Sequence, residues 1–120
     1  MTRIVSEPEF HARLVEVLAT LPAGIGSVTG PGRSGAVAAV YASHLLGVPF
    51  IPFGSRCPTH LGRLLIIDTA RESGATLRKA ERRYAVARPI VVACFEEPPR
   101  VAFWYEAGKP QRYRYERRAA

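Results

Sequence analysis

The chain has 120 residues, of which 48% are hydrophobic and 22% are charged, and its net charge is +7. This is an ordinary globular balance for a single domain. No apolar run reaches the roughly 18 residues of a membrane span, and Met1 to Ser6 lack a signal-peptide pattern, so we expect a cytoplasmic protein with no membrane partner. Cys57 and Cys94 have neither metal-site nor disulfide-framework spacing.

The first element expected is an N-terminal helix. Ser6 and Glu9 have the spacing of a capping box at its start. Apolar residues recur at helical spacing from Phe10 to Leu21. Pro22 and the following residues end the pattern.

Apolar runs and helical patterns then alternate along the chain. This alternation predicts a doubly wound α/β fold with a mainly parallel sheet and crossover helices. The expected strands are residues 25–29, 48–53, 64–67 and 89–95, and the expected helices are residues 36–46, closed by Gly47, and 76–84.

The pattern changes after Phe95, where two acids and two prolines interrupt it. Residues 101–105 and 112–116 predict two strands around a turn at 108–110, which together form a short C-terminal β-hairpin. The expected single domain therefore consists of an N-terminal helix (1–22), an α/β core (23–95) and a hairpin that is also a candidate base-binding hood (96–120).

The most informative stretch is residues 64–76, Leu-Leu-Ile-Ile-Asp-Thr-Ala-Arg-Glu-Ser-Gly-Ala-Thr. The apolar run reads as a buried strand that ends on Asp68, the only aspartate in the chain. A loop of small and hydroxyl residues follows, and a helix is expected to begin near Thr76. A carboxylate at a strand end can hold ribose hydroxyls, and amides and hydroxyls at a helix start can hold a phosphate. The stretch therefore predicts a sugar-phosphate site.

This stretch resembles the phosphoribosyl-diphosphate (PRPP) motif of type I phosphoribosyltransferases. That motif has four apolar residues, two acids, a short variable stretch and then Thr/Ser-Gly-x-Thr. Asp68 matches the first acid, whereas Thr69 stands where the second acid is expected. The resemblance implies that Asp68 and Thr69 contact the ribose and that Asp68 also binds Mg²⁺. It further implies that the 5-phosphate is bound by Glu72, Ser73, Gly74, Ala75 and Thr76.

A second candidate loop, Gly30 to Gly35, satisfies G-x-G-x-x-G between a strand and a helix. A dinucleotide site would also need an acid at the end of the next strand, and residues 48–53 contain none. In the type I family this loop binds pyrophosphate, and Arg33-Ser34-Gly35 resembles its Arg-Gly-Gly sequence. A tight strand–helix turn without a ligand is the alternative. The resemblance implies a pyrophosphate site made by Gly32, Arg33, Ser34 and Gly35, with Arg33 and Asp68 as the catalytic residues.

Two parts of the family pattern are short or variable in this chain. Family members usually carry a long lid between the second and third strands, and only residues 54–62 stand there. The hood that grips the base varies most between family members. Its best candidate here is 101–105, in which Trp104 would stack on a nucleobase while Phe103 and Tyr105 pack the hairpin.

The resemblance implies an enzyme that transfers 5-phosphoribose from PRPP to a nucleobase, releases pyrophosphate and uses Mg²⁺. Because Thr69 carries no charge and the lid is short, a catalytically degenerate fold that binds a nucleotide for sensing or regulation stays open. The net charge and the mixture of arginine and tyrosine at 112–118 leave nucleic acid open as a partner. A homodimer is also plausible for so small a chain.

Overall fold

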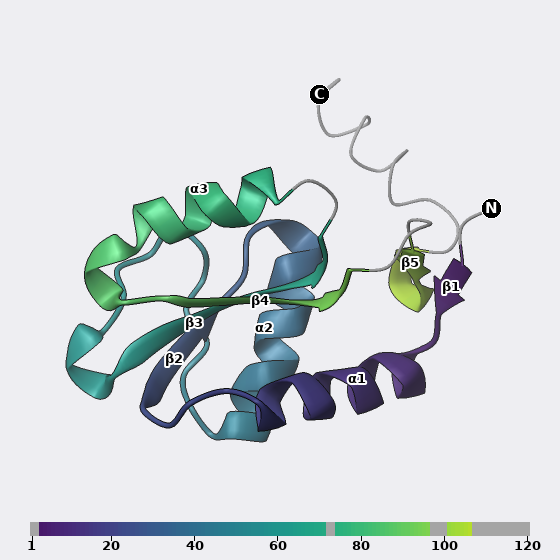
Figure 1. Cartoon of the computed structure of the whole chain (residues 1–120), viewed down its shortest axis with the longest axis horizontal. Helices are drawn as coiled ribbons and strands as arrows, with labels where there is room; N and C mark the ends of the chain where they lie inside the picture. Colours follow the sequence, from purple (N-terminus) through teal and green to yellow (C-terminus); the bar gives the residue numbers. More distant parts are fainter. Residues whose placement is uncertain (1–2, 72–73, 97–100, 107–120) are drawn as a thin grey trace.

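The computed structural model describes residues 3–71, 74–96 and 101–106 (Figure 1). Its strands are β1 (Arg3–Val5), β2 (Ile25–Thr29), β3 (Arg63–Ala70), β4 (Ile90–Phe95) and β5 (Val101–Phe103). Its α-helices are α1 (Glu7–Ala19), α2 (Gly32–Leu46) and α3 (Ala75–Arg83). Short 3₁₀ turns occupy Thr59–Leu61, Ala85–Ala87 and Trp104–Glu106.

The described strands form two parallel sheets. The larger sheet has the order β2-β3-β4, with Asp68 of β3 opposite Ala93 of β4. Phe50 adds a single parallel bridge to Val28 on the other side of β2. The smaller sheet pairs β1 with β5, and Ile4 lies opposite Ala102. The expectation of a mainly parallel α/β fold is therefore confirmed.

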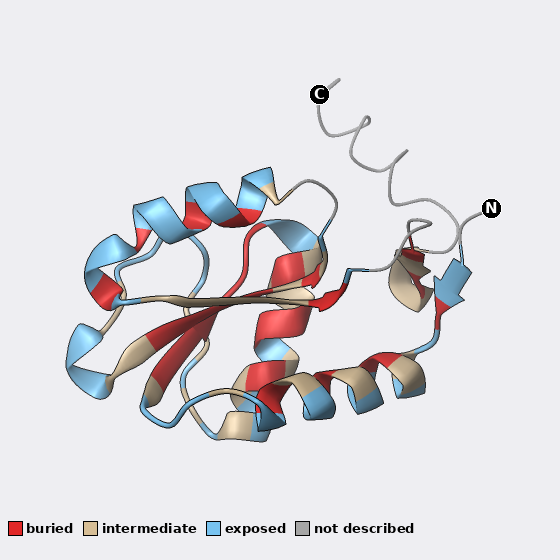
Figure 2. Cartoon of the chain, in the orientation of Figure 1, coloured by how far each residue is buried: buried red, intermediate tan, exposed pale blue. Residues whose placement is uncertain are grey.

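Helices cover both faces of the larger sheet (Figure 1). Successive side chains of a strand point to opposite faces, so Leu65 and Ile67 pack in the cluster that includes α1 and α2, whereas Leu64 and Ile66 pack against α3. All four side chains are fully buried. Figure 2 shows the same pattern, with buried residues along β2, β3 and the inner stripes of the helices. The uninterrupted apolar run of β3 thus follows from its two covered faces.

The helix ends follow the sequence signals closely. The side chain of Ser6 accepts a hydrogen bond from the backbone N of Glu9 at 3.3 Å, so Ser6 caps α1 as expected. The Glu9 carboxylate pairs with Arg3 at 2.6 Å. Gly47 ends α2 in the left-handed conformation, with φ of +70°. That conformation costs glycine little, which confirms the expected end of the helix.

Several expected boundaries are wrong. Residues 48–53 do not form a strand beyond the bridge at Phe50, because Pro49 and Pro52 have no N–H to donate to a ladder. α2 begins at Gly32 and not at residue 36, so most of the expected glycine-rich turn is helical. β3 continues past Asp68 to Ala70, because β4 pairs with it as far as Phe95.

Only the first strand of the expected C-terminal hairpin lies within the described residues. The strand expected at 101–105 ends at Phe103, and its observed partner is β1, which the sequence analysis did not predict. The Glu106 carboxylate accepts a hydrogen bond from the Phe103 backbone N at 3.0 Å, which favours the 3₁₀ turn over a continued strand. The second expected strand, 112–116, and the turn at 108–110 lie outside the described residues.

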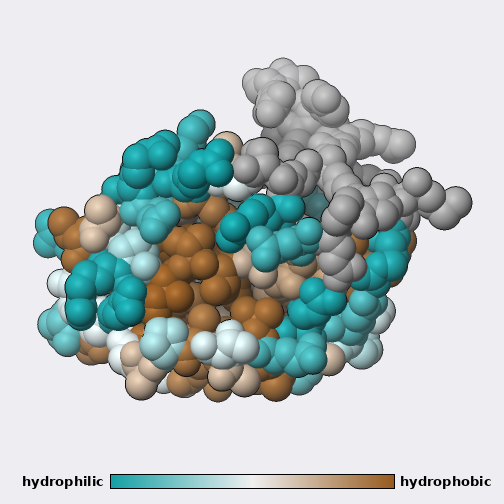
Figure 3. Space-filling view, in the orientation of Figure 1, coloured by the Kyte–Doolittle hydropathy of each residue, from teal (hydrophilic) through white to brown (hydrophobic). Residues whose placement is uncertain are grey.

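β4 is the edge strand of the larger sheet as described. Arg13 of α1 donates a hydrogen bond to the Cys94 carbonyl at 2.9 Å and lies 4.2 Å from the centre of the Phe95 ring. Arg13 therefore covers the carboxyl end of this edge. Figure 3 shows that the surface along the rest of β4, between α1 and α3, is apolar. In the described part of the chain, no helix is long and apolar enough to cross a membrane.

Candidate functional site

Asp68 lies near the carboxyl end of β3, the edge at which open α/β sheets bind ligands. Its carboxyl group is largely buried, and this burial raises its pKa from 3.8 to about 6. Hydrogen bonds from Thr69 lower the pKa, while the charge of Glu106 raises it. The backbone N of Thr69 donates to Oδ1 of Asp68 at 2.7 Å. The site thus holds a carboxylate whose ionisation falls near neutral pH.

Thr69 is buried, with only 2% of its surface exposed. Its hydroxyl lies 3.5 Å from Oδ1 of Asp68, and its side chain lies near the Tyr105 hydroxyl, whose pKa it lowers. In this structure Thr69 therefore contacts the Asp68 carboxylate through its backbone N–H and its side chain. The expected contact of Thr69 with ribose remains a prediction.

The start of α2 presents unpaired helical amides at the same edge of the sheet. The first intrahelical hydrogen bond joins the Gly35 N–H to the Pro31 carbonyl at 3.1 Å. The N–H groups of Gly32, Arg33 and Ser34 precede that bond, and no side chain caps the helix. Together with the positive end of the helix dipole, this arrangement suits an anion.

Close backbone packing explains two of the glycines in the Gly30–Gly35 loop. A Cβ on Gly30 would overlap the Gly35 carbonyl group and would lie 2.6 Å from the Ile67 carbonyl oxygen. A Cβ on Gly35 would lie 2.7 Å from the Gly30 carbonyl carbon. These two positions therefore meet the demands of a tight strand–helix turn. Gly32 and Arg33 are exposed beside them and are accessible to a ligand.

The second predicted phosphate loop is described only in its last part. Glu72 and Ser73 lie outside the described residues. Gly74, with φ of +81°, precedes α3, and the Arg78 N–H bonds the Gly74 carbonyl at 3.0 Å. Ala75 and Thr76 are exposed in the first turn of α3. This part of the loop therefore stands at a helix start, as the phosphate-binding prediction requires.

Tyr105 is a residue of the site that the sequence analysis missed. Its hydroxyl donates to Oγ of Ser34 at 2.9 Å. Its ring stacks on Phe103 with centroids 5.8 Å apart and an interplanar angle of 11°. The two rings therefore pack on each other, whereas the hairpin in which they are expected to pack includes residues 112–116, outside the described residues. Nothing in the alternation of residues 101–105 indicates which loop the Tyr105 hydroxyl reaches. Tyr105 therefore bonds the start of α2 and lies near Thr69 and Asp68 of β3.

Trp104 packs inside the protein on one side. Its ring lies 5.7 Å from Phe10, 6.4 Å from Tyr41 and 5.0 Å from Tyr105, measured between centroids. The residue remains partly exposed. The expected stacking of Trp104 on a nucleobase stays a prediction.

Comparison with solved structures establishes the fold. The chain superposes on the xanthine-guanine-hypoxanthine phosphoribosyltransferase of Helicobacter pylori with a TM-score of 0.70 and 12% identity, over 100% of this chain and 99% of the other. It superposes on the adenine phosphoribosyltransferase of Thermoanaerobacter pseudethanolicus with a TM-score of 0.56 and 11% identity, over 75% and 81% of the two chains. The chain has a type I phosphoribosyltransferase fold.

A third similar structure is a hypothetical protein from Neisseria gonorrhoeae with bound ppGpp. Its TM-score is 0.68 at 10% identity, and the superposition covers 99% of this chain and 98% of that one. No family model matches the sequence, and no curated protein matches it significantly. The phosphoribosyltransferase fold is therefore conserved in shape with very little residue identity.

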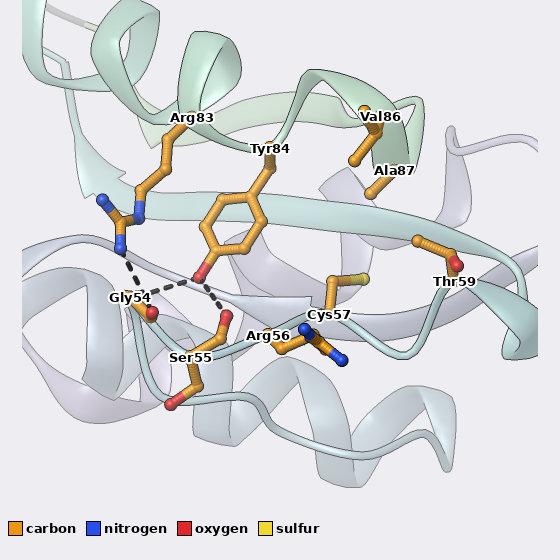
Figure 4. Close-up of a pocket in the computed structure, with 9 residues that line it drawn as sticks. All are labelled: Gly54, Ser55, Arg56, Cys57, Thr59, Arg83, Tyr84, Val86 and Ala87. Atoms are coloured by element: carbon orange, nitrogen blue, oxygen red, sulfur yellow. Dashed lines mark hydrogen bonds between the residues drawn. The ribbon is translucent and has the colours of Figure 1, made fainter.

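Residues 54–62, where a shortened lid is expected, are tied to the end of α3. The Tyr84 hydroxyl accepts a hydrogen bond from the Gly54 backbone N and donates one to the Ser55 carbonyl, both at 2.8 Å (Figure 4). Arg83 also donates to the Gly54 carbonyl at 3.2 Å. These bonds fix the start of the segment against the end of α3.

A cavity of about 450 Å³ opens between this segment and the end of α3. Figure 4 shows the Tyr84 ring in its middle and Cys57 and Arg56 on the opposite wall. The cavity lies beside the 3₁₀ turn that precedes β4, whereas Asp68 lies toward the carboxyl end of the sheet. It is therefore separate from the predicted phosphoribosyl site. Its lining consists of Gly54, Ser55, Arg56, Cys57, Thr59, Arg83, Tyr84, Val86 and Ala87.

Metal ligands are few in the described ranges. No group of three or more His, Cys, Asp or Glu residues gathers there to hold an ion. Asp68 offers a hard carboxylate, with Glu106 close enough to raise its pKa. Magnesium is commonly bound through one or two carboxylates together with substrate phosphates. The donor set fits a Mg²⁺ ion that is held mainly by its phosphate ligand.

Proposed function

We propose that the protein binds PRPP at the carboxyl edge of β2 and β3 and transfers its 5-phosphoribosyl group to a nucleobase. The observation that supports this proposal most strongly is the position of Tyr105, whose hydroxyl donates to Oγ of Ser34 at 2.9 Å and lies near Thr69 and Asp68, since Thr69 lowers and Asp68 raises the pKa of Tyr105. Because one side chain reaches both, the predicted pyrophosphate loop and the predicted ribose-binding strand border one site. The loop alone or the strand alone would be weak support for a PRPP site.

Each part of the site has a defined role in the proposed reaction. The amides of Gly32 to Ser34 and the Arg33 guanidinium would hold the pyrophosphate. Asp68 would hold the ribose hydroxyls, and the start of α3 would hold the 5-phosphate. The bond between the ribose C1 and the pyrophosphate oxygen would break, a bond from C1 to a base nitrogen would form, and the proton of that nitrogen would pass to solvent. Fixed donors at the pyrophosphate stabilise the charge that develops there.

Mg²⁺ is proposed as the cofactor. Asp68 would hold it, and the ion would neutralise part of the charge on the departing pyrophosphate. Because the carboxylate must be ionised to bind a cation, burial of Asp68 tunes this step to near-neutral pH.

A second candidate function is nucleotide sensing without catalysis. Thr69 supplies no second charge beside the ribose, and it is buried. The segment in the position of the lid is held by Tyr84. The neighbour from Neisseria gonorrhoeae, which has a similar fold, carries bound ppGpp. The same site residues are therefore also consistent with a protein that binds a nucleotide and catalyses no reaction.

Calorimetric titration with PRPP and Mg²⁺ tests both candidates. The wild type is compared with Asp68→Asn and with Glu81→Gln, which removes an exposed acid on α3 as a matched control. We expect micromolar binding that Asp68→Asn abolishes and Glu81→Gln preserves. Pyrophosphate release with a panel of nucleobases then separates the enzyme from the sensor. A folded protein that binds neither PRPP nor ppGpp contradicts both.

A further inference from the structure

The direction of the bond between Tyr105 and Ser34 carries information about the pyrophosphate site. The Tyr105 hydroxyl is the donor and Oγ of Ser34 is the acceptor, 2.9 Å apart. A serine hydroxyl that accepts a hydrogen bond keeps its own proton for a further acceptor. Ser34 stands in the first turn of α2, beside the amides that lack helical partners. Its proton is therefore available to an anion at this helix start.

The Tyr105 hydroxyl is held in place by its surroundings. Its ring lies between Phe103, stacked at 5.8 Å, and Trp104, edge-on at 5.0 Å. Phe103 is buried, with 2% of its surface exposed, and its backbone N–H is bonded by Glu106. The turn that contains Tyr105 is thus anchored on both sides, and the hydroxyl reaches Ser34 from a fixed direction.

The same hydroxyl lies near Thr69 and Asp68 of β3, since Thr69 lowers and Asp68 raises the pKa of Tyr105. It therefore spans from α2 to the strand that carries Asp68. Rotation of the Ser34 side chain would break its hydrogen bond with Tyr105. One conformation of the Ser34 side chain is therefore favoured.

We propose that Tyr105 is a positioning residue of the pyrophosphate site, which fixes the Ser34 hydroxyl so that its proton points to the anion bound at the start of α2. This inference rests on the proposed function. It assigns to the C-terminal segment a part in holding pyrophosphate, in addition to any contact of Trp104 with a base. Tyr105 acts through Ser34 and does not itself touch the ligand.

The test is calorimetric titration with inorganic pyrophosphate and Mg²⁺ for the wild type, Tyr105→Phe, Ser34→Ala and the double variant. Tyr105→Phe keeps the aromatic packing and removes only the hydroxyl. We expect it to weaken pyrophosphate binding by about tenfold, as the loss of a hydrogen bond of about 1.4 kcal/mol would. In the Ser34→Ala background the same change should have no further effect, because the two residues act as one unit.

One further variant controls for effects on folding, and another tests the serine hydroxyl itself. Tyr84→Phe removes a hydroxyl that bonds backbone groups at Gly54 and Ser55, and it should leave pyrophosphate affinity unchanged. Ser34→Thr keeps a hydroxyl, so it should restore most of the affinity that Ser34→Ala loses, together with the sensitivity to Tyr105→Phe. Fluorescence of Trp104, the only tryptophan in the chain, reports whether the local packing is preserved.

The outcomes separate this inference from the proposed function. Wild-type binding that Tyr105→Phe leaves unchanged overturns the inference alone. Tighter binding by Tyr105→Phe also overturns it, because the hydroxyl would then compete with the anion. Independent, additive effects of the two substitutions contradict positioning through Ser34. Absence of pyrophosphate and PRPP binding by the wild type overturns the proposed function together with the inference.

Discussion

Gly30 and Gly35 meet backbone to backbone at the turn between β2 and α2. A Cβ on Gly30 would overlap the carbonyl group of Gly35, and a Cβ on Gly35 would lie 2.7 Å from the Gly30 carbonyl carbon. The contact brings the first turn of α2 close to the end of β2. It therefore determines where the amides of Gly32 to Ser34 stand relative to Asp68.

Substitution Gly30→Ala should destabilise the protein strongly. The new methyl group would meet backbone atoms that cannot rotate away, so we expect a loss of about 3 kcal/mol in the free energy of unfolding. Gly32→Ala is the matched control, because no atom lies within 4 Å of its Cβ position. The positive φ of Gly32, +69°, should cost only about 1 kcal/mol. Urea denaturation measures the free energy of unfolding of both variants. Equal losses in the two variants would refute the close backbone contact at Gly30.

Removing the charge of Asp68 should stabilise the fold. Burial raises the pKa of this carboxyl from 3.8 to about 6, so the ionised form is disfavoured in the folded protein at pH 7. The rise corresponds to up to about 3 kcal/mol. Asp68→Asn should therefore increase the free energy of unfolding at pH 7 by a part of this amount. Guanidinium denaturation measures the increase, and a less stable Asp68→Asn variant would contradict it.

The raised pKa of Asp68 also predicts that the stability of the protein depends on pH. Because the folded-state pKa of Asp68 is the higher one, the folded protein binds more protons than the unfolded chain between about pH 4 and 6. The contribution of Asp68 to stability should fall as the pH rises through this window and stay constant above it. The difference in free energy of unfolding between wild type and Asp68→Asn isolates this contribution. A difference that is the same at pH 4 and pH 7 would exclude the raised pKa.

Ligand affinity should change with pH in the opposite sense. An ionised Asp68 is needed to hold Mg²⁺, so the affinity for PRPP with Mg²⁺ should rise through about pH 6, where half of the carboxyl groups are ionised, and level off above about pH 7. Calorimetry at pH 5, 6 and 7 measures this trend. The titrations use buffers in which free PRPP has a known charge, since its own phosphates also titrate. A flat profile would indicate that Asp68 does not hold the ion.

Arg33 should contribute to anion binding through its charge. The residue is exposed beside the unpaired amides of α2. Arg33→Ala should weaken pyrophosphate binding by roughly fivefold to tenfold at low salt, and the effect should shrink as salt increases. Arg82→Ala, on the exposed face of α3, is the control with the same loss of charge. If both variants lose the same pyrophosphate affinity, the effect comes from the overall positive charge and not from a contact of Arg33 with the anion.

Tyr84→Phe should affect stability but not the phosphoribosyl site. The variant loses two hydrogen bonds to backbone groups of Gly54 and Ser55, which should cost about 1 to 3 kcal/mol. Thermal unfolding measures the loss. PRPP affinity should remain that of the wild type, and a large fall in affinity would show that residues 54–62 take part in ligand binding.

Most of the fold could be predicted from local sequence patterns. β2 was predicted at its observed bounds, and the N-cap at Ser6 and the end of α2 at Gly47 were predicted correctly. These features depend on neighbouring residues, because capping and periodicity act over a few positions. The short strand β1 was missed because Arg3 to Val5 are too few to establish a period, and it forms only by pairing with β5.

The chemical type of the site was predicted better than its construction. Asp68 after an apolar run and the glycine-rich loop before α2 are sequence features, and both lie toward the carboxyl end of their strands as expected. Glu72 and Ser73 lie outside the described residues.

The sequence by itself determined the alternation of β2, β3 and β4 with the helices, the two candidate phosphate loops and the place of Asp68 in β3, because these follow from patterns within short segments. Only the tertiary structure decided that Tyr105 bonds Ser34, 71 positions earlier in the chain, and that burial moves the pKa of Asp68 to about 6. Both depend on surroundings assembled from distant parts of the chain, and no local pattern encodes which of them meet.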